Sequence, residues 1–149
     1  MIAVYNGVNL NLLGRRDPAL YGPLTLQLLE SRVYEWARER SLTARCFQTN
    51  HEGELIEHLH DCTGWATGVI LNPGAWTHYS YALRDAVEYV AQQGIPVVEV
   101  HLSDIEHREA FRRHSVLTDV ASHRVIGRGP DGYRDAIDWL AARITPAVD

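Results

Sequence analysis

Residues 68–72 read Gly-Val-Ile-Leu-Asn, a short apolar run that ends on a polar residue. Residues 97–100 read Val-Val-Glu-Val, a second run rich in β-branched side chains and without regular alternation of polar and apolar positions. Strands that helices cover on both faces have this composition, because neither side of the sheet meets water. The two runs therefore predict strands of a parallel sheet.

Outward from these runs, β-rich segments alternate with amphipathic helical segments along the chain. Five β–α units in a row imply an open, doubly wound sheet with right-handed crossovers. The common five-stranded version has the flavodoxin-like strand order, so we expect a three-layer α/β/α fold. The predicted strands are Met1–Asn6, Thr43–Gln48, Gly68–Asn72, Pro96–His101 and His123–Gly127, and the predicted helices lie near 25–40, 52–63, 78–93, 104–114 and 131–144.

The composition is that of an ordinary globular protein. The chain has 149 residues and a formal net charge of −5 at pH 7. Binding to nucleic-acid phosphates needs a basic excess, so this charge argues against a nucleic-acid partner. No basic leader with an apolar stretch precedes the first strand, and no apolar run is long enough to span a membrane. We therefore expect a single cytoplasmic domain over residues 1–149.

The connection from Gly7 to Pro23 is too long for a routine turn between a strand and a helix. Long loops in compact domains are usually lids or binding loops. We expect residues of about 7–23 to form an active-site lid with leucines anchoring its base. The polar residues of this loop are Asn9, Asn11, Arg15, Arg16, Asp17 and Tyr21.

Polar residues also follow the other predicted strands, where ligands bind in open parallel sheets. A lone asparagine after a strand is more often a turn former, but several polar residues at one edge favour a pocket. The candidate acid–base groups are His101, His78, Tyr21 and the loop arginines Arg15 and Arg16. Tyr21 acts as a base only where a nearby cation favours the phenolate. The polar residues at this edge are Asn50, His51, Asn72, Thr77, His78, His101 and Ser103.

Two segments look like cofactor motifs and do not qualify. Residues 127–132 match G-x-G-x-x-G, but no strand follows them to carry a ribose-binding acid, so a glycine-rich turn is the simpler interpretation. The histidines from His51 to His60 lack zincin spacing, because Leu55 occupies the position of the second ligand. The sequence therefore predicts neither a dinucleotide nor a metal.

Several motifs rich in polar and glycine residues occur in collinear order over nearly the whole chain. They include Asn9-Leu10-Asn11-Leu12-Leu13-Gly14 with Arg16-Asp17-Pro18 and Tyr21-Gly22, Asn50-His51-Glu52-Gly53-Glu54-Leu55, Asn72-Pro73-Gly74-Ala75 with Thr77-His78, Ala82-Leu83 with Asp85, Val98-Glu99-Val100-His101-Leu102-Ser103, Arg108-Glu109 with Phe111-Arg112 and His114-Ser115, and Gly127, Gly129 and Gly132-Tyr133. In these motifs the sequence resembles the type II dehydroquinase family.

The resemblance implies an anti elimination of water from 3-dehydroquinate through an enolate, which gives 3-dehydroshikimate. It implies that Tyr21 is the base, and that Arg16 holds Tyr21 as phenolate and stabilises transition-state charge. It further implies that His101 protonates the departing hydroxyl, and that Asn9 orders a water against the enolate oxygen.

The resemblance also implies how the substrate is held. The substrate-binding side chains would be Asn72, His78, Asp85 and Arg112. The carboxylate would lie on the backbone N–H groups of Leu102 and Ser103, which were expected to open a helix. Family members assemble as a dodecamer of four trimers, in which a neighbour completes each site. No step needs a metal or an organic cofactor.

Some positions depart from the family pattern. Val8 stands where proline is usual, Trp76 differs in the substrate-side loop, and residues 104–107 and 123–124 are atypical. Two alternatives stay open: a related lyase with another hydroxy acid as substrate, and a non-catalytic flavodoxin-like module. A non-catalytic module has no need of the acid–base set. The sequence does not distinguish shikimate biosynthesis from quinate breakdown, because both use the same step.

Overall fold

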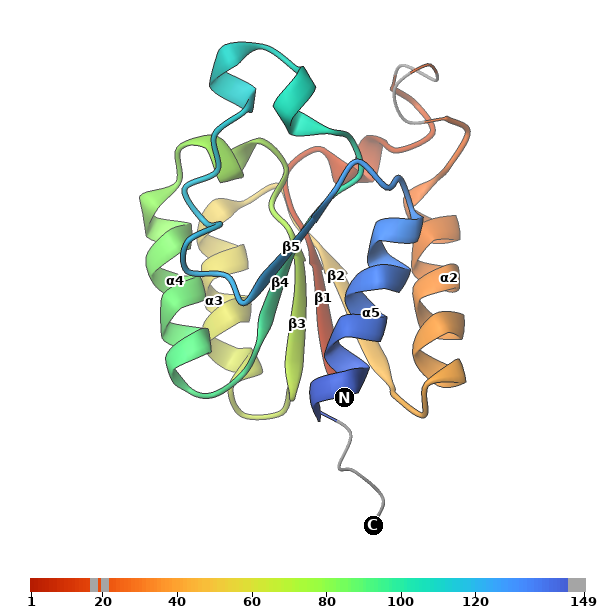
Figure 1. Cartoon of the computed structure of the whole chain (residues 1–149), viewed down its shortest axis with the longest axis vertical. Coiled ribbons are helices and arrows are strands. Elements are labelled where there is room, and N and C mark those ends of the chain that lie inside the picture. The colour runs from red at the N-terminus through yellow and green to blue at the C-terminus, as the bar shows by residue number, and fades with distance from the viewer. Residues whose placement is uncertain (17–18, 20–21, 145–149) are drawn as a thin grey trace.

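The computed structural model, which describes residues 1–16, 19 and 22–144, contains a five-stranded sheet in the order β2-β1-β3-β4-β5 (Figure 1). Every neighbouring pair of strands is parallel. This is the flavodoxin-like order, so the predicted topology is confirmed. The strands are β1 (Ile2–Asn6), β2 (Ala44–Gln48), β3 (Gly68–Asn72), β4 (Val97–His101) and β5 (His123–Ile126).

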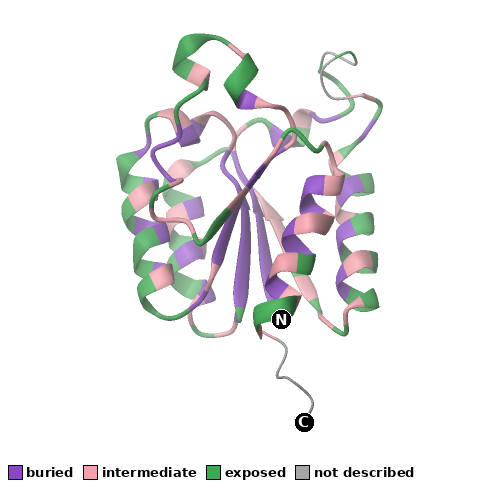
Figure 2. Cartoon of the chain, viewed as in Figure 1, coloured by how far each residue is buried: buried purple, intermediate pink, exposed green. Residues whose placement is uncertain are grey.

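Helices cover both faces of the sheet (Figures 1 and 2). The helices α3 (Glu52–Cys62) and α4 (Tyr81–Gln92) pack on one face, and α2 (Leu26–Glu39) and α5 (Asp131–Ile144) pack on the other. The strands β1, β3 and β4 are buried along their whole length, which explains why their sequences do not alternate. Trp76 joins the apolar core under α3 and α4.

Side-chain caps fix where two of the helices begin. Thr25 caps α2, and Ser80 caps α4 by accepting a hydrogen bond from the backbone N–H of Leu83 at 3.0 Å. Because Ser80 caps the helix, α4 begins at Tyr81, three residues later than predicted. Within residues 1–16, 19 and 22–144, none of the helices combines the length and the apolar character needed to cross a bilayer.

The helix predicted near 104–114 was wrong. This segment forms two short 3₁₀ helices, η3 (Ile105–His107) and η4 (Ala110–Arg112). Ile105 is buried, but the Phe111 side chain is 62% exposed. The segment therefore lacks an apolar stripe that would hold an α-helix against the sheet.

Candidate active site

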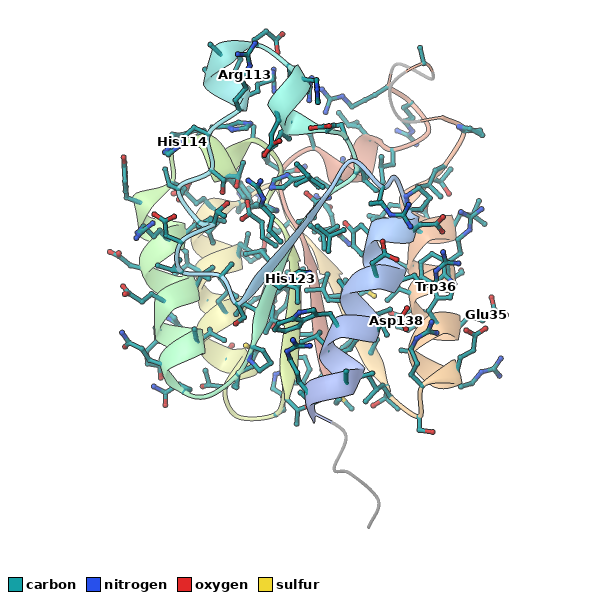
Figure 3. The ribbon with its side chains drawn as sticks, viewed as in Figure 1. Glu35, Trp36, Arg113, His114, His123 and Asp138 are labelled. Carbon is teal, nitrogen blue, oxygen red and sulfur yellow. The ribbon has the colours of Figure 1, made fainter. Side chains whose placement is uncertain are left out.

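A cavity of about 150 Å³ opens beyond the carboxyl ends of β1, β3 and β4. These ends lie side by side because the strands are parallel and Asn6 pairs with Asn72 in the register of β1 and β3. The segment that includes Arg113 and His114 rises beyond the same edge of the sheet (Figure 3). The cavity is lined by Val8, Asn9, Leu10, Leu13, Arg16, Asn72, Gly74, Ala75, His78, His101, Leu102, Ser103, Ile105, Arg108 and Arg112.

The start of the loop after β1 is fixed by side chains from β2 and the turn after it. Asn9 adopts a left-handed backbone conformation with φ 67°, and its N–H donates to Oδ1 of Asn50 at 2.9 Å. The Gln48 amide donates to the same Asn50 oxygen and to the carbonyl of Gly7. Asn50, predicted to lie at the pocket edge, therefore positions Asn9 and does not itself line the cavity.

A close backbone approach forms the floor of the cavity. Gly74 has φ 62°, and a Cβ atom at this position would lie 2.7 Å from the carbonyl oxygen of Val8. Only glycine allows both the backbone angle and the contact without strain. Val8 lines the cavity beside this turn, whereas Trp76 is buried in the core and does not line it. Of these two departures from the family pattern, only Val8 lies where it faces a ligand.

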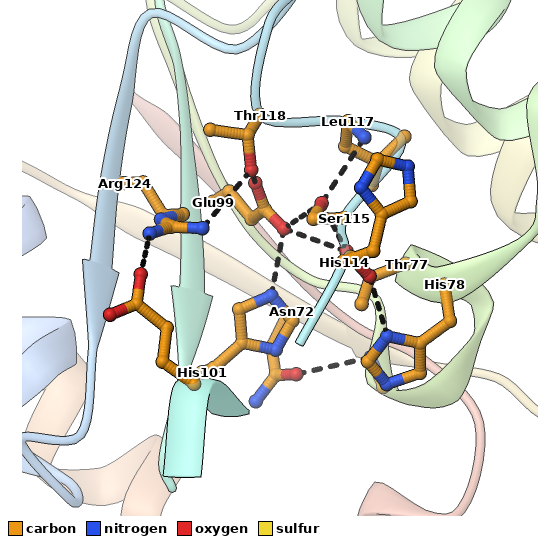
Figure 4. A network of polar contacts seen from close by, with 12 residues as sticks. Asn72, Thr77, His78, Glu99, His101, His114, Ser115, Leu117, Thr118 and Arg124 are labelled. Carbon is orange, nitrogen blue, oxygen red and sulfur yellow. Dashed lines mark hydrogen bonds and ion pairs between the residues drawn. The ribbon is translucent and has the colours of Figure 1, made fainter. Parts of the chain in front are cut away.

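The only acid–base pair buried in the cavity wall, among the described residues, is His101 with Glu99. His101 is 5% exposed, Glu99 is fully buried, and the His101 Nε2 atom lies 2.8 Å from Oε1 of Glu99 (Figure 4). Both residues belong to β4, two positions apart, so their side chains share one face of the sheet.

Three hydroxyl groups surround the Glu99 carboxylate. Thr77 and Ser115 donate to Oε1 at 2.7 and 2.6 Å, and Thr118 donates to Oε2 at 2.9 Å. Burial by itself raises the pKa of Glu99, but the hydrogen bond and charge of His101, with the hydroxyl groups, lower that pKa to about 2. Glu99 is therefore an anion at neutral pH.

The Glu99 bond also decides which nitrogen of His101 is available for chemistry. A carboxylate only accepts hydrogen bonds, so the Nε2 atom carries the proton that points to Glu99. The Nδ1 atom is then the one that gains or loses a proton, and His101 lines the cavity. This arrangement is that of an oriented general acid or base.

His78 also lines the cavity, and its contacts differ from those of His101. Its Nδ1 atom lies 2.8 Å from the carbonyl oxygen of His114, so Nδ1 carries a proton and donates it (Figure 4). Burial lowers the pKa of His78, and the charges of His101, Arg112 and Arg108 lower it further. His78 is therefore neutral at pH 7, and its Nε2 atom is a hydrogen-bond acceptor.

Positive charge gathers on the remaining wall of the cavity. Arg16, Arg108 and Arg112 line it, and Nε of Arg112 lies 2.9 Å from a carboxylate oxygen of Glu109. Arginine side chains are suited to bind a carboxylate. The cavity therefore combines an oriented acid–base histidine with an anion-binding wall.

Two backbone N–H groups complete this wall. The turn after β5 holds the carbonyls of Leu102 and Ser103, through Gly129 N–H at 2.9 Å and Gly127 N–H at 3.2 Å. In a planar trans peptide, the Ser103 N–H then points away from the turn. The α-helix expected to begin here is absent, so a helix N-terminus does not contribute to this wall. The predicted glycine-rich turn is confirmed.

The comparison with known families decides which family the chain belongs to. A sequence model described as Dehydroquinase class II matches residues 1–141. The chain belongs to the class II dehydroquinase family. It is 48% identical over 139 residues to the 3-dehydroquinate dehydratase of Bacillus pumilus, with 93% of this chain and 92% of that protein covered.

Solved structures of class II dehydroquinases have the same fold. The type II dehydroquinase from Butyrivibrio crossotus superposes with a TM-score of 0.90 at 40% identity and covers 93% of this chain and 95% of that one. The type II dehydroquinase from Propionibacterium acnes gives a TM-score of 0.89 at 40% identity, with 95% of both chains covered. The resemblance stated from the sequence is therefore confirmed.

Most residues that the dehydroquinase resemblance singled out meet in this cavity. The predicted residues that line it are Asn9, Arg16, Asn72, His78, His101, Leu102, Ser103 and Arg112. Asp85 is exposed on α4 and does not line the cavity of its own chain. Tyr21 lies outside the described residues. The predicted lid at about 7–23 includes residues 17, 18, 20 and 21, which also lie outside them.

Sequence reasoning missed Glu99 and Arg108 as residues of the site. Glu99 did carry a signal, because it is the one charged residue in the apolar run Val97–Val100. A carboxylate in a strand that is covered on both faces needs hydrogen-bond donors around it. Such a buried polar network is a signal of a functional site. Arg108 stands in one of the motifs that carry the resemblance, but no role was assigned to it, because its segment was predicted to be a helix.

Proposed function

We propose that this chain catalyses the dehydration of 3-dehydroquinate to 3-dehydroshikimate, a step of the shikimate pathway. The observation that carries the proposal is the buried Glu99–His101 pair, which opens into a cavity lined by arginines. The substrate carries a carboxylate and loses a hydroxyl group, so it needs both an anion site and a general acid. The relatives named 3-dehydroquinate dehydratase support this substrate.

His101 is the general acid of the proposed mechanism. Its Nε2–H stays hydrogen-bonded to Glu99. Meanwhile the Nδ1 proton passes to the departing hydroxyl group, which leaves as water. The positive charge on the imidazole ring is stabilised by the Glu99 anion 2.8 Å away. The positive charge of the imidazole therefore has a negative partner inside the sheet.

Tyr21 is the base that removes the proton α to the ketone, with Arg16 keeping it as a phenolate. The support for Tyr21 is the sequence resemblance, and the support for Arg16 includes its place in the cavity lining. Asn9, whose backbone is held by Asn50, orders a water against the enolate oxygen that forms. Base and acid then act from opposite faces of the ring, as an anti elimination requires.

The remaining residues bind the substrate. Its carboxylate lies on the N–H groups of Leu102 and Ser103, with Arg112 near it, and its hydroxyl groups bond to Asn72 and to the acceptor nitrogen of His78. Each of these residues lines the cavity. The mechanism uses side chains, backbone and water alone, without a metal or an organic cofactor. The enzyme works in the cytoplasm as a single domain.

Asp85 takes part through assembly. It is exposed on α4, away from the cavity of its own chain, so it reaches a substrate only in a neighbouring subunit. We therefore propose a homododecamer of four trimers, in which Asp85 completes the neighbour's site. Light scattering at assay concentration is expected to give a particle of about twelve times the mass of one chain. A fully active monomer would contradict the assembly and leave the reaction itself intact.

A direct assay tests the function. Purified protein is treated with EDTA and dialysed, then mixed with 3-dehydroquinate, and the conjugated enone is followed by its absorbance. Turnover without added metal or nucleotide is expected. The His101→Ala variant serves as the control for a contaminating dehydratase. Activity lost with EDTA and restored by zinc, or turnover of a different hydroxy acid only, would overturn the proposal.

A further inference from the structure

A line of buried hydrogen bonds runs from the cavity into the core beneath it. The Gly74 N–H donates to Oδ1 of Asn72 at 3.2 Å, and Nδ2 of Asn72 donates to the Tyr133 hydroxyl at 2.9 Å. That hydroxyl donates to Oδ1 of Asn6 at 2.6 Å. Tyr133 is fully buried, and Asn6 and Asn72 are 1% and 4% exposed, so no bulk water competes for these groups.

The directions of the first two bonds in this line are fixed from the Gly74 end. A backbone N–H only donates, so Gly74 requires the oxygen of the Asn72 amide on its side. The amide nitrogen must then face Tyr133, whose oxygen accepts and whose hydrogen goes to Asn6. At the far end, Nδ2 of Asn6 is buried with no partner among the described residues.

The hydroxyl of Tyr133 stays protonated throughout the working pH range. Burial raises the pKa of Tyr133 well above its ordinary value, although the hydrogen bond from Asn72 lowers it. Tyr133 enters from the first turn of α5, directly after the glycine-rich turn that holds Leu102 and Ser103. One segment of chain thus supports both the anion-binding N–H groups and Asn72.

We propose that Tyr133 is a positioning residue that holds the Asn72 amide in one orientation toward the substrate. After its bonds to Gly74 and Tyr133, the amide keeps one N–H and one oxygen lone pair for the cavity. Fixed in this way, Asn72 presents its remaining N–H and its oxygen at set positions toward the substrate. The inference rests on the proposed function, because it takes Asn72 to bind the substrate of that reaction.

The test compares Tyr133→Phe with Tyr5→Phe. Both tyrosines are buried and donate one hydrogen bond, but Tyr5 bonds to the His58 carbonyl on the opposite face of the sheet. For Tyr133→Phe we expect KM to rise about three- to ten-fold with kcat within about two-fold, as when one orienting hydrogen bond is lost. Both variants should lower the unfolding temperature by a similar amount. Tyr5→Phe should, however, leave kcat/KM unchanged.

A double-mutant cycle separates positioning from a general structural effect. In an Asn72→Ala background, Tyr133→Phe should cause no further change in kcat/KM, because the group it positions is gone. An equal loss in both backgrounds, or an unchanged KM in the single variant, would overturn the inference. If Tyr133→Phe does not fold, Asn6→Leu replaces it, since it removes the acceptor that fixes the Tyr133 hydrogen.

Crystal structures of the wild type and Tyr133→Phe give a readout that does not depend on activity. The variant is expected to show the Asn72 side chain displaced or in more than one position, because the partner of its Nδ2 atom is lost. An Asn72 side chain in the wild-type position would contradict the inference. If the wild type does not turn over 3-dehydroquinate, the proposed function fails, while this comparison still decides whether Tyr133 positions Asn72.

Discussion

The imidazole of His101 and the carboxylate of Glu99 form a 2.8 Å hydrogen bond inside the sheet, with neither side chain more than 6% exposed. Burying a charge in this way is costly unless donors surround it, and Thr77, Ser115 and Thr118 supply them. The hydrogen bond and charge of His101, together with the hydroxyl groups, keep Glu99 ionised, and Glu99 in turn orients the His101 ring.

Replacing Glu99 by glutamine tests whether the carboxylate orients His101. The amide keeps the size of the side chain but removes the charged acceptor of the Nε2–H bond, so the imidazole is held less firmly. We expect kcat at neutral pH to fall by at least about ten-fold, because an oriented general acid contributes about 10² or more. Glu57→Gln, an exposed change on α3, is the control. A kcat close to that of the wild type would contradict this role of Glu99.

The same carboxylate should contribute to stability in acid. The pKa of Glu99 is about 2 in the folded protein against an ordinary 4.5. A depressed pKa contributes stability that is present above about pH 4.5 and is lost as the pH falls toward 2. The contribution is on the order of 3 kcal/mol. Urea unfolding from pH 7 to pH 3 should show a steeper loss of free energy in the wild type than in Glu99→Gln. Parallel curves would refute the assignment.

Gly74→Ala tests the close approach at the cavity floor. The new Cβ would lie 2.7 Å from the Val8 carbonyl in a backbone conformation with φ 62°. We expect a loss of about 1–3 kcal/mol in the free energy of unfolding, together with a higher KM. Gly53→Ala, where a Cβ meets nothing within 4 Å, should be neutral or stabilise by about 0.5–1 kcal/mol. Thermal unfolding of both variants makes the comparison, and equal effects would argue against strain at Gly74.

Tyr21→Phe tests the proposed base. It keeps the ring but removes the group that takes the α-proton, so kcat should fall by at least about 10²-fold with little change in substrate binding. Tyr89→Phe, an exposed change on α4, should leave kcat unchanged. Near-normal turnover by Tyr21→Phe would show that another group is the base.

Arg16→Gln and His101→Ala divide the two proton transfers. Without the cation of Arg16 the Tyr21 phenolate is less favoured, so the acidic limb of the pH–rate profile should move to higher pH.

His101→Ala should still remove the α-proton but lose the hydroxyl slowly. It should therefore exchange that proton with solvent deuterium faster than it forms product. Mass spectrometry of recovered substrate checks this, and an absence of exchange would place His101 in the first step.

Local features of the sequence were enough to predict the layers of the fold. The runs at 69–71 and 97–100 became buried strands because their side chains suit a surface covered on both faces. Thr25 became a helix cap because capping depends on a hydroxyl within one turn of the chain. The prediction for 104–114 was wrong because the polar pattern of this segment fits a helix, whereas packing against the core decides whether a helix forms.

The candidate residues could be named from the sequence, but their roles depend on contacts between distant segments. Glu99 is held by Thr77, Ser115 and Thr118, and Tyr133 meets Asn6 across 127 residues of chain. Periodicity and motifs describe neighbours within a few turns and carry no information on which side chains meet across the sheet. The sequence therefore determined the strand order and the family, and the tertiary structure decided which buried groups orient His101 and Asn72.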